Sequence, residues 1–160
     1  MNGVSQFVFK PQGLVTRAQL VTIIYRVAES PKVEFKGIFE DVKDGKFYSK
    51  AVEWAAAEGV VTGKTATKFA PEEAITREQI AAILYRYKGS PEIEADLSQF
   101  PDADDASNYA KKALTWAVKE GLINGIKSGD VTTLAPKDNA TRAQIASIIM
   151  RFLDGSYDCK

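Results

Sequence analysis

The chain has 160 residues, of which 45% are hydrophobic and 26% are charged, so its length and composition are those of a globular protein with a buried core. Lysine and arginine together number 21, as do aspartate and glutamate, and this balance gives no reason to expect a nucleic-acid partner. No apolar stretch has the length of a membrane span, and the residues after Met1 lack the pattern of a signal peptide, so we expect no membrane insertion.

The sequence lacks the side chains on which most enzymes depend. It contains no histidine, which removes the commonest general base and the commonest metal ligand. Its single cysteine, Cys159, lies next to the end, where a lone thiol forms neither a disulfide framework nor a zinc site. We therefore predict no catalytic residue, no metal site and no cofactor, and we expect that the chain is not an enzyme.

One segment of the chain occurs three times. It begins with a Thr-Arg-x-Gln box, continues with apolar residues at helical spacing, and starts at Thr16, Thr76 and Thr141, at intervals of 60 and 65 residues. A proline precedes each threonine by five residues: Pro11, Pro71 and Pro136. Self-similarity at such an interval indicates a repeat protein.

In chain order, residues 1–13 match the end of a repeat, because Gly3 and Phe9 correspond to Gly63 and Phe69 at an offset of 60. The first repeat is therefore expected to lack its front half. The resulting boundaries are 1–35, 36–97 and 98–155, followed by a tail at 156–160, with all repeats in one structural domain.

Each Thr-Arg-x-Gln box predicts a helix start, because the threonine hydroxyl and the glutamine side chain cap it reciprocally. The first such helix should run from about 16 to 28, and the third should end near Leu153, before a frayed tail. Further helices are expected at 47–58 and 108–120, ended by Gly59 and Gly121. Three arginines should lie in the last turns of the boxed helices, where a cation suits the dipole: Arg26, Arg86 and Arg151.

The loop of the third repeat is longer than that of the second. Pro136 follows Gly125 by 11 positions, whereas Pro71 follows Gly63 by 8. We expect the extra residues, around Lys127 to Asp130, to be exposed and to change what this repeat presents to a ligand.

The arginine of each box does not serve its own helix. Arg17, Arg77 and Arg142 occupy the first helical position, where a positive charge opposes the helix dipole by about 0.3–1 kcal/mol. Such an arginine either pairs with a nearby carboxylate, such as Glu72 or Glu73, or joins the free backbone N–H groups of the helix start in an anion site. Three aligned copies favour the anion site, and Arg77→Ala should then leave stability within about ±0.5 kcal/mol, as a surface substitution does.

Four further residues occupy equivalent places in the last two repeats. Trp54 and Trp116 either anchor the core or form a wall for a sugar face, and core packing is the favoured interpretation. Asp41 and Asp102 are too isolated to form a catalytic pair, so we expect them to cap or turn the chain entering the helix.

This arrangement resembles the S-layer homology domain of bacterial surface proteins over nearly the whole chain. In the second repeat the matching elements are Phe39-x-Asp41-Val42, Ala51-Val52-x-x-Ala55, Glu58-Gly59-Val-Val-Thr-Gly63, Phe69-x-Pro71 and Ile75-Thr-Arg-Glu-Gln79. In the third they are Phe100-x-Asp102, Trp116-Ala117, Gly121-Leu-Ile-Asn-Gly125, Pro136 and Thr141-Arg-Ala-Gln144. The glutamine of each box replaces the family's glutamate and keeps the capping box.

The resemblance implies an all-α fold of three repeats in a pseudo-threefold spindle, with short helices, long Gly- and Pro-containing loops, and grooves between repeats. It implies a non-covalent anchor, outside a bacterial cell, that grips the pyruvate ketal of secondary cell-wall polysaccharide. The family's key arginine maps onto the arginine of each box. The candidate carbohydrate-binding residues are Arg17, Arg77, Arg142, Trp54, Trp116, Gly63 and Gly125.

Two other expectations concern partners. The alternative function is a helical-repeat module for protein–protein interaction, although the tetratricopeptide repeat of that kind has a period of about 34 residues instead of about 60. A first repeat without its front half would leave an apolar surface uncovered, which predicts self-association through that repeat.

Overall fold

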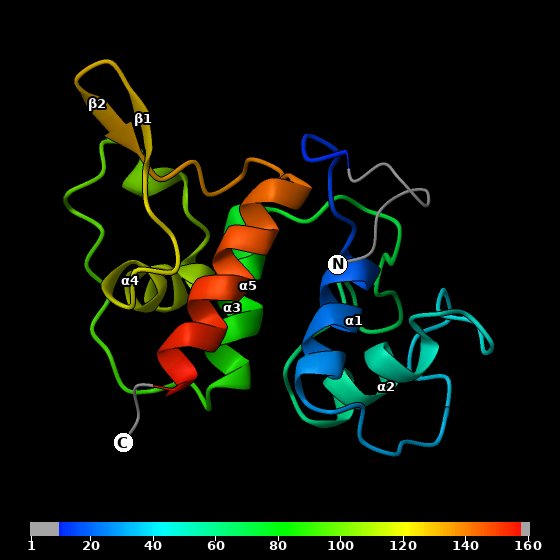
Figure 1. Cartoon of the computed structure of the whole chain (residues 1–160). Coiled ribbons are helices and arrows are strands. Elements are labelled where there is room, and N and C mark those ends of the chain that lie inside the picture. Colours follow the sequence, from blue (N-terminus) through cyan, green and yellow to red (C-terminus); the bar gives the residue numbers. More distant parts are fainter. Residues whose placement is uncertain (1–9, 158–160) are drawn as a thin grey trace. The chain divides into compact units, whose positions relative to one another are not determined.

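The computed structural model describes residues 10–157, and this part of the chain is mostly helical (Figure 1). The α-helices are α1 (Arg17–Val27), α2 (Ser49–Ala57), α3 (Arg77–Tyr87), α4 (Lys111–Lys119) and α5 (Arg142–Tyr157). Two short 3₁₀ helices, η1 (Ala103–Asp105) and η2 (Asn108–Ala110), precede α4. No helix among the described residues is both long and apolar enough to cross a bilayer.

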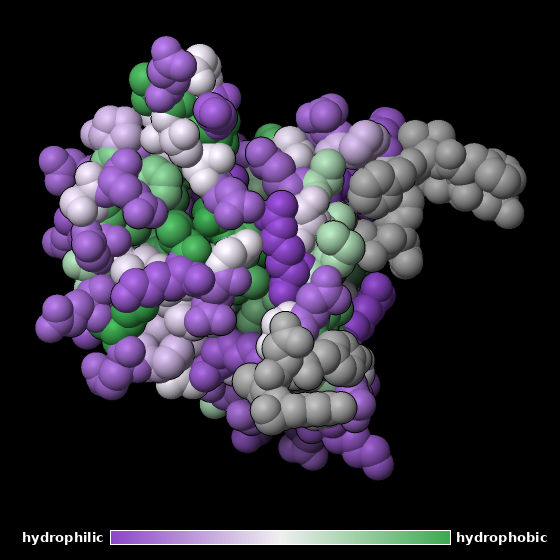
Figure 2. Space-filling view, turned by 60° about the vertical axis from the view of Figure 1, so that its left-hand side comes forward, coloured by the Kyte–Doolittle hydropathy of each residue, from purple (hydrophilic) through white to green (hydrophobic). Residues whose placement is uncertain are grey.

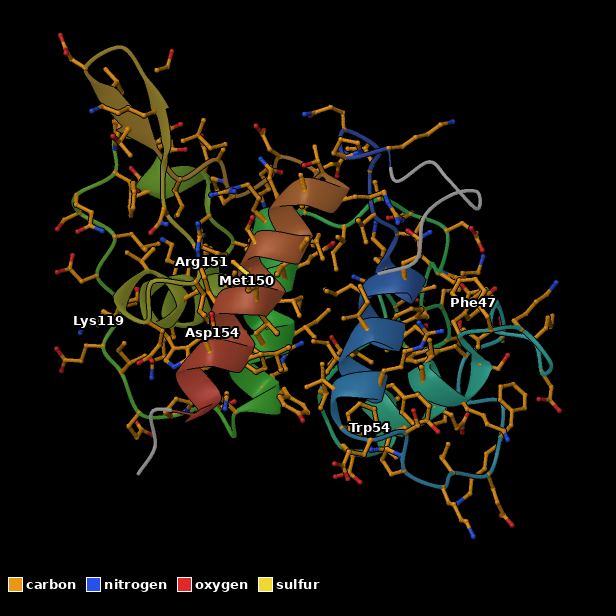
Figure 3. All side chains as sticks on the ribbon, in the orientation of Figure 1. Phe47, Trp54, Lys119, Met150, Arg151 and Asp154 are labelled. Atoms are coloured by element: carbon orange, nitrogen blue, oxygen red, sulfur yellow. The ribbon has the colours of Figure 1, made fainter. Side chains whose placement is uncertain are left out.

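The chain divides into two compact units, each with its own core. One unit is Val15–Ile75, in which α1 packs against α2. Trp54 of α2, labelled in Figure 3, contacts Tyr25 of α1 at a ring-centroid distance of 5.5 Å. The other consists of Met1–Leu14 with Thr76–Lys160, and we call it the Thr76–Lys160 unit. In it α3 packs against α4 and runs beside α5 (Figure 1). The ring of Tyr87 at the end of α3 contacts that of Phe152 in α5, with a centroid distance of 5.8 Å.

The three predicted capping boxes are confirmed. Thr16 and Thr76 accept a hydrogen bond from the backbone N–H of the glutamine three residues later, and that glutamine side chain accepts from the threonine N–H. Thr141 and Gln144 exchange the same two bonds at 3.0 and 3.2 Å. Gly59 and Gly121 follow α2 and α4 with φ of +71° and +70°, as C-caps require.

Other helix ends differ from the predictions. α2 begins at Ser49 instead of 47, and the helix predicted from 108 begins as η2. α5 continues to Tyr157, four residues beyond the predicted end at Leu153, because neither a proline nor a left-handed glycine interrupts it. Arg151 therefore lies inside the helix, and its prediction as a last-turn cation is wrong. The predicted counterparts Gly3 and Phe9 lie outside the described residues.

The all-α prediction is wrong at the insertion of the third repeat. Strands β1 (Ile126–Ser128) and β2 (Val131–Thr133) form an antiparallel hairpin in which Ile126 faces Thr133 and Ser128 faces Val131. Gly129 takes φ +62° at the first of two turn positions, as a tight hairpin turn requires. β-Branched Val131-Thr-Thr, next to a Gly-Asp turn, favours a strand.

Candidate functional site

The arginines at the starts of α1 and α3 hold distant loops in place. Arg77 is 4% exposed; its Nε–H donates to the Leu134 carbonyl oxygen at 3.0 Å, and its Nη2 donates to the Asn124 carbonyl oxygen at 3.0 Å. Burial lowers the pKa of Arg77, while Asp138 and Asp102 oppose that shift, and arginine starts so high that it stays charged at neutral pH.

The other unit repeats this arrangement. Arg17 donates through Nε to the Phe69 carbonyl oxygen at 2.9 Å and through Nη2 to the Thr62 carbonyl oxygen at 3.3 Å. Its guanidinium also lies 4.7 Å from the centroid of the Phe69 ring. These arginines therefore serve the fold after all, and the premise of a stability-neutral Arg77→Ala substitution is wrong.

The backbone N–H groups at the three helix starts are bound within the protein. The first two N–H groups of each helix donate to carbonyl oxygens of a proline-containing loop. For α1 these bonds are Arg17 to Glu73 and Ala18 to Pro71; for α3, Arg77 to Asp138 and Glu78 to Pro136; for α5, Arg142 to Gly13 and Ala143 to Pro11. Because the box threonine takes the third N–H, the helix starts are not the open anion receptors that we expected.

Asp102 and Asp41 have a structural role, as expected, but they hold the same distant loops and not the chain entering the next helix. The Asp102 carboxylate accepts from the backbone N–H groups of Leu134 and Ala135 at 2.8 and 2.7 Å. Asp41 accepts from the equivalent Phe69 and Ala70 at 2.8 and 2.7 Å. The residues at the end of each loop, Ala135 and Ala70, have φ of +49° and +60°, a conformation that costs a non-glycine residue about 1–2 kcal/mol and that these bonds hold.

Because these carboxylates bind backbone N–H groups in the folded state, we expect the free energy of unfolding to decrease in acid. Burial would raise the pKa of Asp102, but the N–H donors of Leu134 and Ala135 outweigh it and hold the pKa below its usual range. A lowered folded-state pKa adds stability above the unfolded value of about 3.9 and loses it as pH falls through the folded value. The free energy of unfolding should therefore fall below about pH 4.

Urea unfolding at a series of pH values from 7 to 2.5 measures this effect. Asp102→Asn should lower stability at pH 7 and flatten the decline in acid, because the titrating carboxylate is gone. The exposed Asp130→Asn, in the hairpin turn, is the matched control and should keep the parent profile. An Asp102→Asn profile parallel to that of the parent at every pH would contradict the assignment.

Glu78 forms a second buried network in the Thr76–Lys160 unit. It is 3% exposed and stands where the other two boxes have alanine. Its carboxylate accepts from the backbone N–H and hydroxyl of Ser107, both at 2.9 Å, and from Lys137 Nζ at 2.7 Å. Burial would raise the pKa of Glu78, but Lys137 and Ser107 lower it overall, so the network ties η2 to the start of α3.

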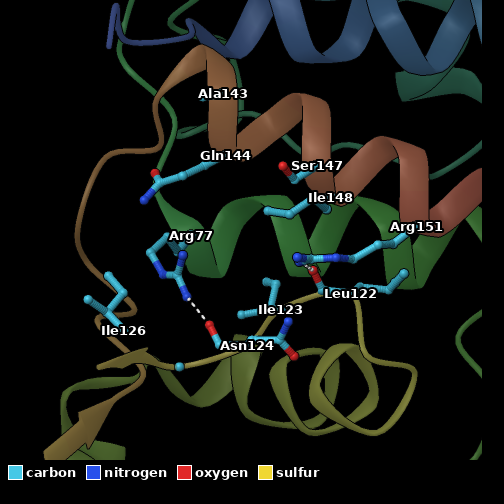
Figure 4. A pocket seen from close by; sticks show the side chains of 11 residues that line it. Arg77, Leu122, Ile123, Asn124, Ile126, Ala143, Gln144, Ser147, Ile148 and Arg151 are labelled. Carbon is cyan, nitrogen blue, oxygen red and sulfur yellow. Dashed lines mark hydrogen bonds between the residues drawn. The ribbon is translucent and has the colours of Figure 1, made fainter. Parts of the chain in front are cut away.

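A pocket of about 310 Å³ lies in the Thr76–Lys160 unit, between the start of α3, the loop after α4, and α5 (Figure 4). It is lined by Arg77, Leu122, Ile123, Asn124, Gly125, Ile126, Ala143, Gln144, Ser147, Ile148 and Arg151. Below the hairpin, hydrophobic residues gather and are framed by hydrophilic ones (Figure 2).

The charged lining of this pocket is entirely positive. Arg77 borders it from the start of α3, and Arg151 reaches it from α5 and donates through Nη1 to the Leu122 carbonyl oxygen at 3.4 Å (Figure 4). No carboxylate is among its lining residues, whereas Gln144 and Ser147 add polar groups. The pocket thus offers two guanidinium groups over an apolar floor, which suits an anion that carries an apolar part.

Of the seven sequence-predicted site residues, Arg77 and Gly125 line this pocket. Arg17 and Gly63 lie in the Val15–Ile75 unit, and Arg142 is 7% exposed at the start of α5. Trp54 and Trp116 are 8% and 7% exposed and pack against Tyr25 and Tyr85, which favours the core-packing interpretation.

The sequence interpretation missed Arg151, Gln144 and Ser147 as pocket residues. Gln144 was assigned only a capping role and Arg151 only a dipole role, and both do line the pocket. The recurrence of arginine at the positions of Arg26, Arg86 and Arg151 was the available signal.

The sequence model of the family described as "S-layer homology domain" matches residues 38–81 and 99–146, which together make up more than half of the chain. Over 98% of its length the chain is 32% identical to the amylopullulanase of Thermoanaerobacterium thermosulfurigenes, and over 91% it is 33% identical to the surface-layer 125 kDa protein of Lysinibacillus sphaericus. It is also 26% identical over 91% of its length to the cellulosome-anchoring protein of Acetivibrio thermocellus.

The chain spans only 8%, 12% and 33% of the length of these three relatives, respectively. What they share with it is therefore one segment of larger proteins. The second and third Thr-Arg-x-Gln boxes, the loop-holding aspartates and the C-cap glycines lie within the two matched ranges. On this match, the chain belongs to the S-layer homology domain family.

Proposed function

We propose that this chain is a non-covalent anchoring module that holds a larger protein at the outer surface of a bacterial cell. Two relatives support this proposal by name, since one is a surface-layer protein and another a cellulosome-anchoring protein. The amylopullulanase shares this segment although the chain spans only 8% of its length, so its enzymatic activity is not carried over. A segment that recurs in proteins of such different names is best explained by a shared location.

The proposed ligand is an anionic wall polysaccharide, and the pyruvate ketal of a secondary cell-wall polysaccharide fits the pocket. Its carboxylate would pair with the guanidinium groups of Arg77 and Arg151. Its methyl group and sugar ring would lie against Ile123 and Ile148. The observation that carries the proposal is the exclusively positive charge of the pocket lining.

We also propose that the chain consists of three equivalent repeats. The same helix-start contact occurs three times: α1 receives the carbonyls of the Pro71 loop, α3 those of the Pro136 loop, and α5 those of the Pro11 loop. This recurrence supports three equivalent repeats of pseudo-threefold symmetry, bounded at 1–35, 36–97 and 98–155. We propose that Arg17 and Arg142 occupy the corresponding positions of two further sites.

Binding to purified, pyruvylated wall polysaccharide, before and after mild acid removes the ketal, tests the ligand. The chain should bind the intact polymer and lose most of that binding once the carboxylate is gone. Equal binding to both preparations would show that the carboxylate is not recognised.

Arg151→Ala should weaken binding to the intact polymer by about 10- to 100-fold, because a charge-assisted hydrogen bond contributes about 1.5–3 kcal/mol. Lys119→Ala is the matched control, since this exposed lysine of α4 is not part of the pocket lining (Figure 3). It makes the same change in net charge and should leave binding nearly unchanged. A similar loss in both variants would mean that only overall charge attracts the polymer.

A further inference from the structure

The β1–β2 hairpin is specific to the third repeat. Eight residues separate Gly125 from Leu134, whereas five separate the equivalent Gly63 from Phe69. In the described part of the chain, β1 and β2 form the one sheet. The additional residues therefore form a hairpin in the loop of the third repeat, whereas the loop of the second repeat has no such insertion.

The hairpin presents one face toward the pocket. Side chains alternate along a strand, so the register places Ile126, Ser128, Val131 and Thr133 on the same side, which we call the hairpin face. Ile126 lines the pocket, and Val131, diagonally across from it, is 51% exposed. The hairpin face thus continues the pocket lining outward, beyond Ile126, which Figure 4 shows at the base of the hairpin.

The opposite side of the hairpin is fixed against the pocket loop. A Cβ on Gly125 would lie 2.2 Å from the Thr132 methyl carbon, so Thr132 packs directly against this glycine. Gly125 itself lines the pocket. The hairpin is therefore braced where it meets the pocket, and its free face keeps a defined position relative to Arg77.

We propose that the hairpin face binds the sugar residue next to the charged residue held in the pocket. This inference rests on the proposed function and adds a second subsite to it. The face combines two apolar branched side chains with two hydroxyl groups, which matches the C–H faces and hydroxyl edges of a pyranose. Two exposed apolar side chains offer far less area than the roughly 800 Å² that each partner buries in a stable protein–protein interface, so a glycan fits better than a protein.

Val131→Ser and Val131→Asp test the subsite without touching the pocket lining. Each variant is titrated by calorimetry with two probes: the methyl glycoside of a pyruvylated hexose, and an oligosaccharide of two repeating units cut from the pyruvylated polysaccharide. Both variants should lose about tenfold in affinity for the oligosaccharide, because one apolar contact is lost. Their affinity for the monosaccharide should stay equal to that of the parent.

Two further variants complete the experiment. Replacing residues 127–133 with the Thr-Ala-Thr-Lys sequence of residues 65–68 removes the hairpin, keeps Ile126 of the pocket lining, and should reproduce the loss for the oligosaccharide. Met150→Ser is the matched control, because Met150 is 59% exposed on α5 and is not part of the pocket lining. It should bind both probes as the parent does.

The outcomes separate the two proposals. If the parent binds both probes and the Val131 variants bind the oligosaccharide equally well, the second subsite is wrong and the pocket proposal stands. If the parent prefers neither probe over their ketal-free forms, the proposed function is wrong, and the subsite is wrong with it. An equal loss for both probes would place Val131 in the pocket itself and would also overturn the inference.

Discussion

Arg77→Ala is expected to lower the free energy of unfolding by about 2–4 kcal/mol, because two hydrogen bonds from a charged group are lost and such a bond contributes about 1.5–3 kcal/mol net of water. The bond to Asn124 is only partly buried, so water replaces some of its contribution. The carbonyl oxygen of Leu134 would lose the donor that now reaches it inside the protein. This loss is large compared with the total free energy of unfolding of a native protein, which is usually about 5–15 kcal/mol. Urea unfolding monitored by tryptophan fluorescence measures it.

Arg151→Ala provides the comparison, because Arg151 lines the same pocket but is exposed and donates through one long bond of 3.4 Å. Its stability should stay within about ±0.5 kcal/mol of the parent. Both variants should bind pyruvylated polysaccharide weakly when assayed at a temperature where both are folded. An Arg77→Ala variant as stable as the parent would show that the loop carbonyls find other donors. A destabilised variant that binds normally would leave Arg77 with a purely structural role.

The features predicted best from the sequence are those set by neighbouring residues. The Thr16 and Thr76 capping boxes depend on a glutamine three residues away, and the C-cap at Gly59 depends on the helix that it ends. Such signals need no knowledge of the tertiary structure. Each signal recurs at intervals of about 60 residues, and this recurrence supports the assignment of the helices more strongly than a single copy would.

The partners of the box arginines could not be predicted in this way. The bonds of Arg17 and Arg77 span 52 and 57 residues and end on backbone carbonyls. Every residue carries a carbonyl, so nothing in the sequence indicates which carbonyl oxygen accepts the hydrogen bond from the arginine. The unfavourable interaction with the helix dipole correctly indicated that these arginines do not stabilise their own helices. Their hydrogen bonds to loop carbonyls, and not an anion alone, explain why arginine occupies these positions.

The pocket was hidden for a related reason. Its cation Arg151 was read as an end-of-helix residue, and only the extension of α5 to Tyr157 places it inside the helix, facing the loop at Leu122. The hairpin has strands of three residues, too short for alternation to stand out from a loop. Tertiary contacts decide both features.

Gly63→Ala is expected to destabilise the chain by about 3 kcal/mol or more, at the upper end of the range for overpacking. A Cβ at Gly63 would lie 2.2 Å from the Thr65 carbonyl oxygen, 2.6 Å from a ring carbon of Phe39 and 2.7 Å from the Lys68 carbonyl oxygen. Two of these three atoms belong to the backbone and cannot rotate away. The glycine therefore has a packing reason to be there, whatever its part in a ligand site.

Thermal and urea unfolding of Gly63→Ala is compared with that of alanine substitutions at two other glycines, Gly125 and Gly155. At Gly125 the closest atom, at 2.2 Å, is a methyl carbon of Thr132, and the next two lie at 3.0 Å, so Gly125→Ala should cost less, about 1–2 kcal/mol. Gly155 lies in α5 with nothing within 4 Å of its Cβ position, and Gly155→Ala should raise stability by about 0.5–1 kcal/mol through helix propensity. From the most to the least stable, the expected order is Gly155→Ala, parent, Gly125→Ala and Gly63→Ala. If Gly63→Ala melts with the parent but binds wall polysaccharide poorly, close approach to a ligand, and not loop packing, explains the glycine.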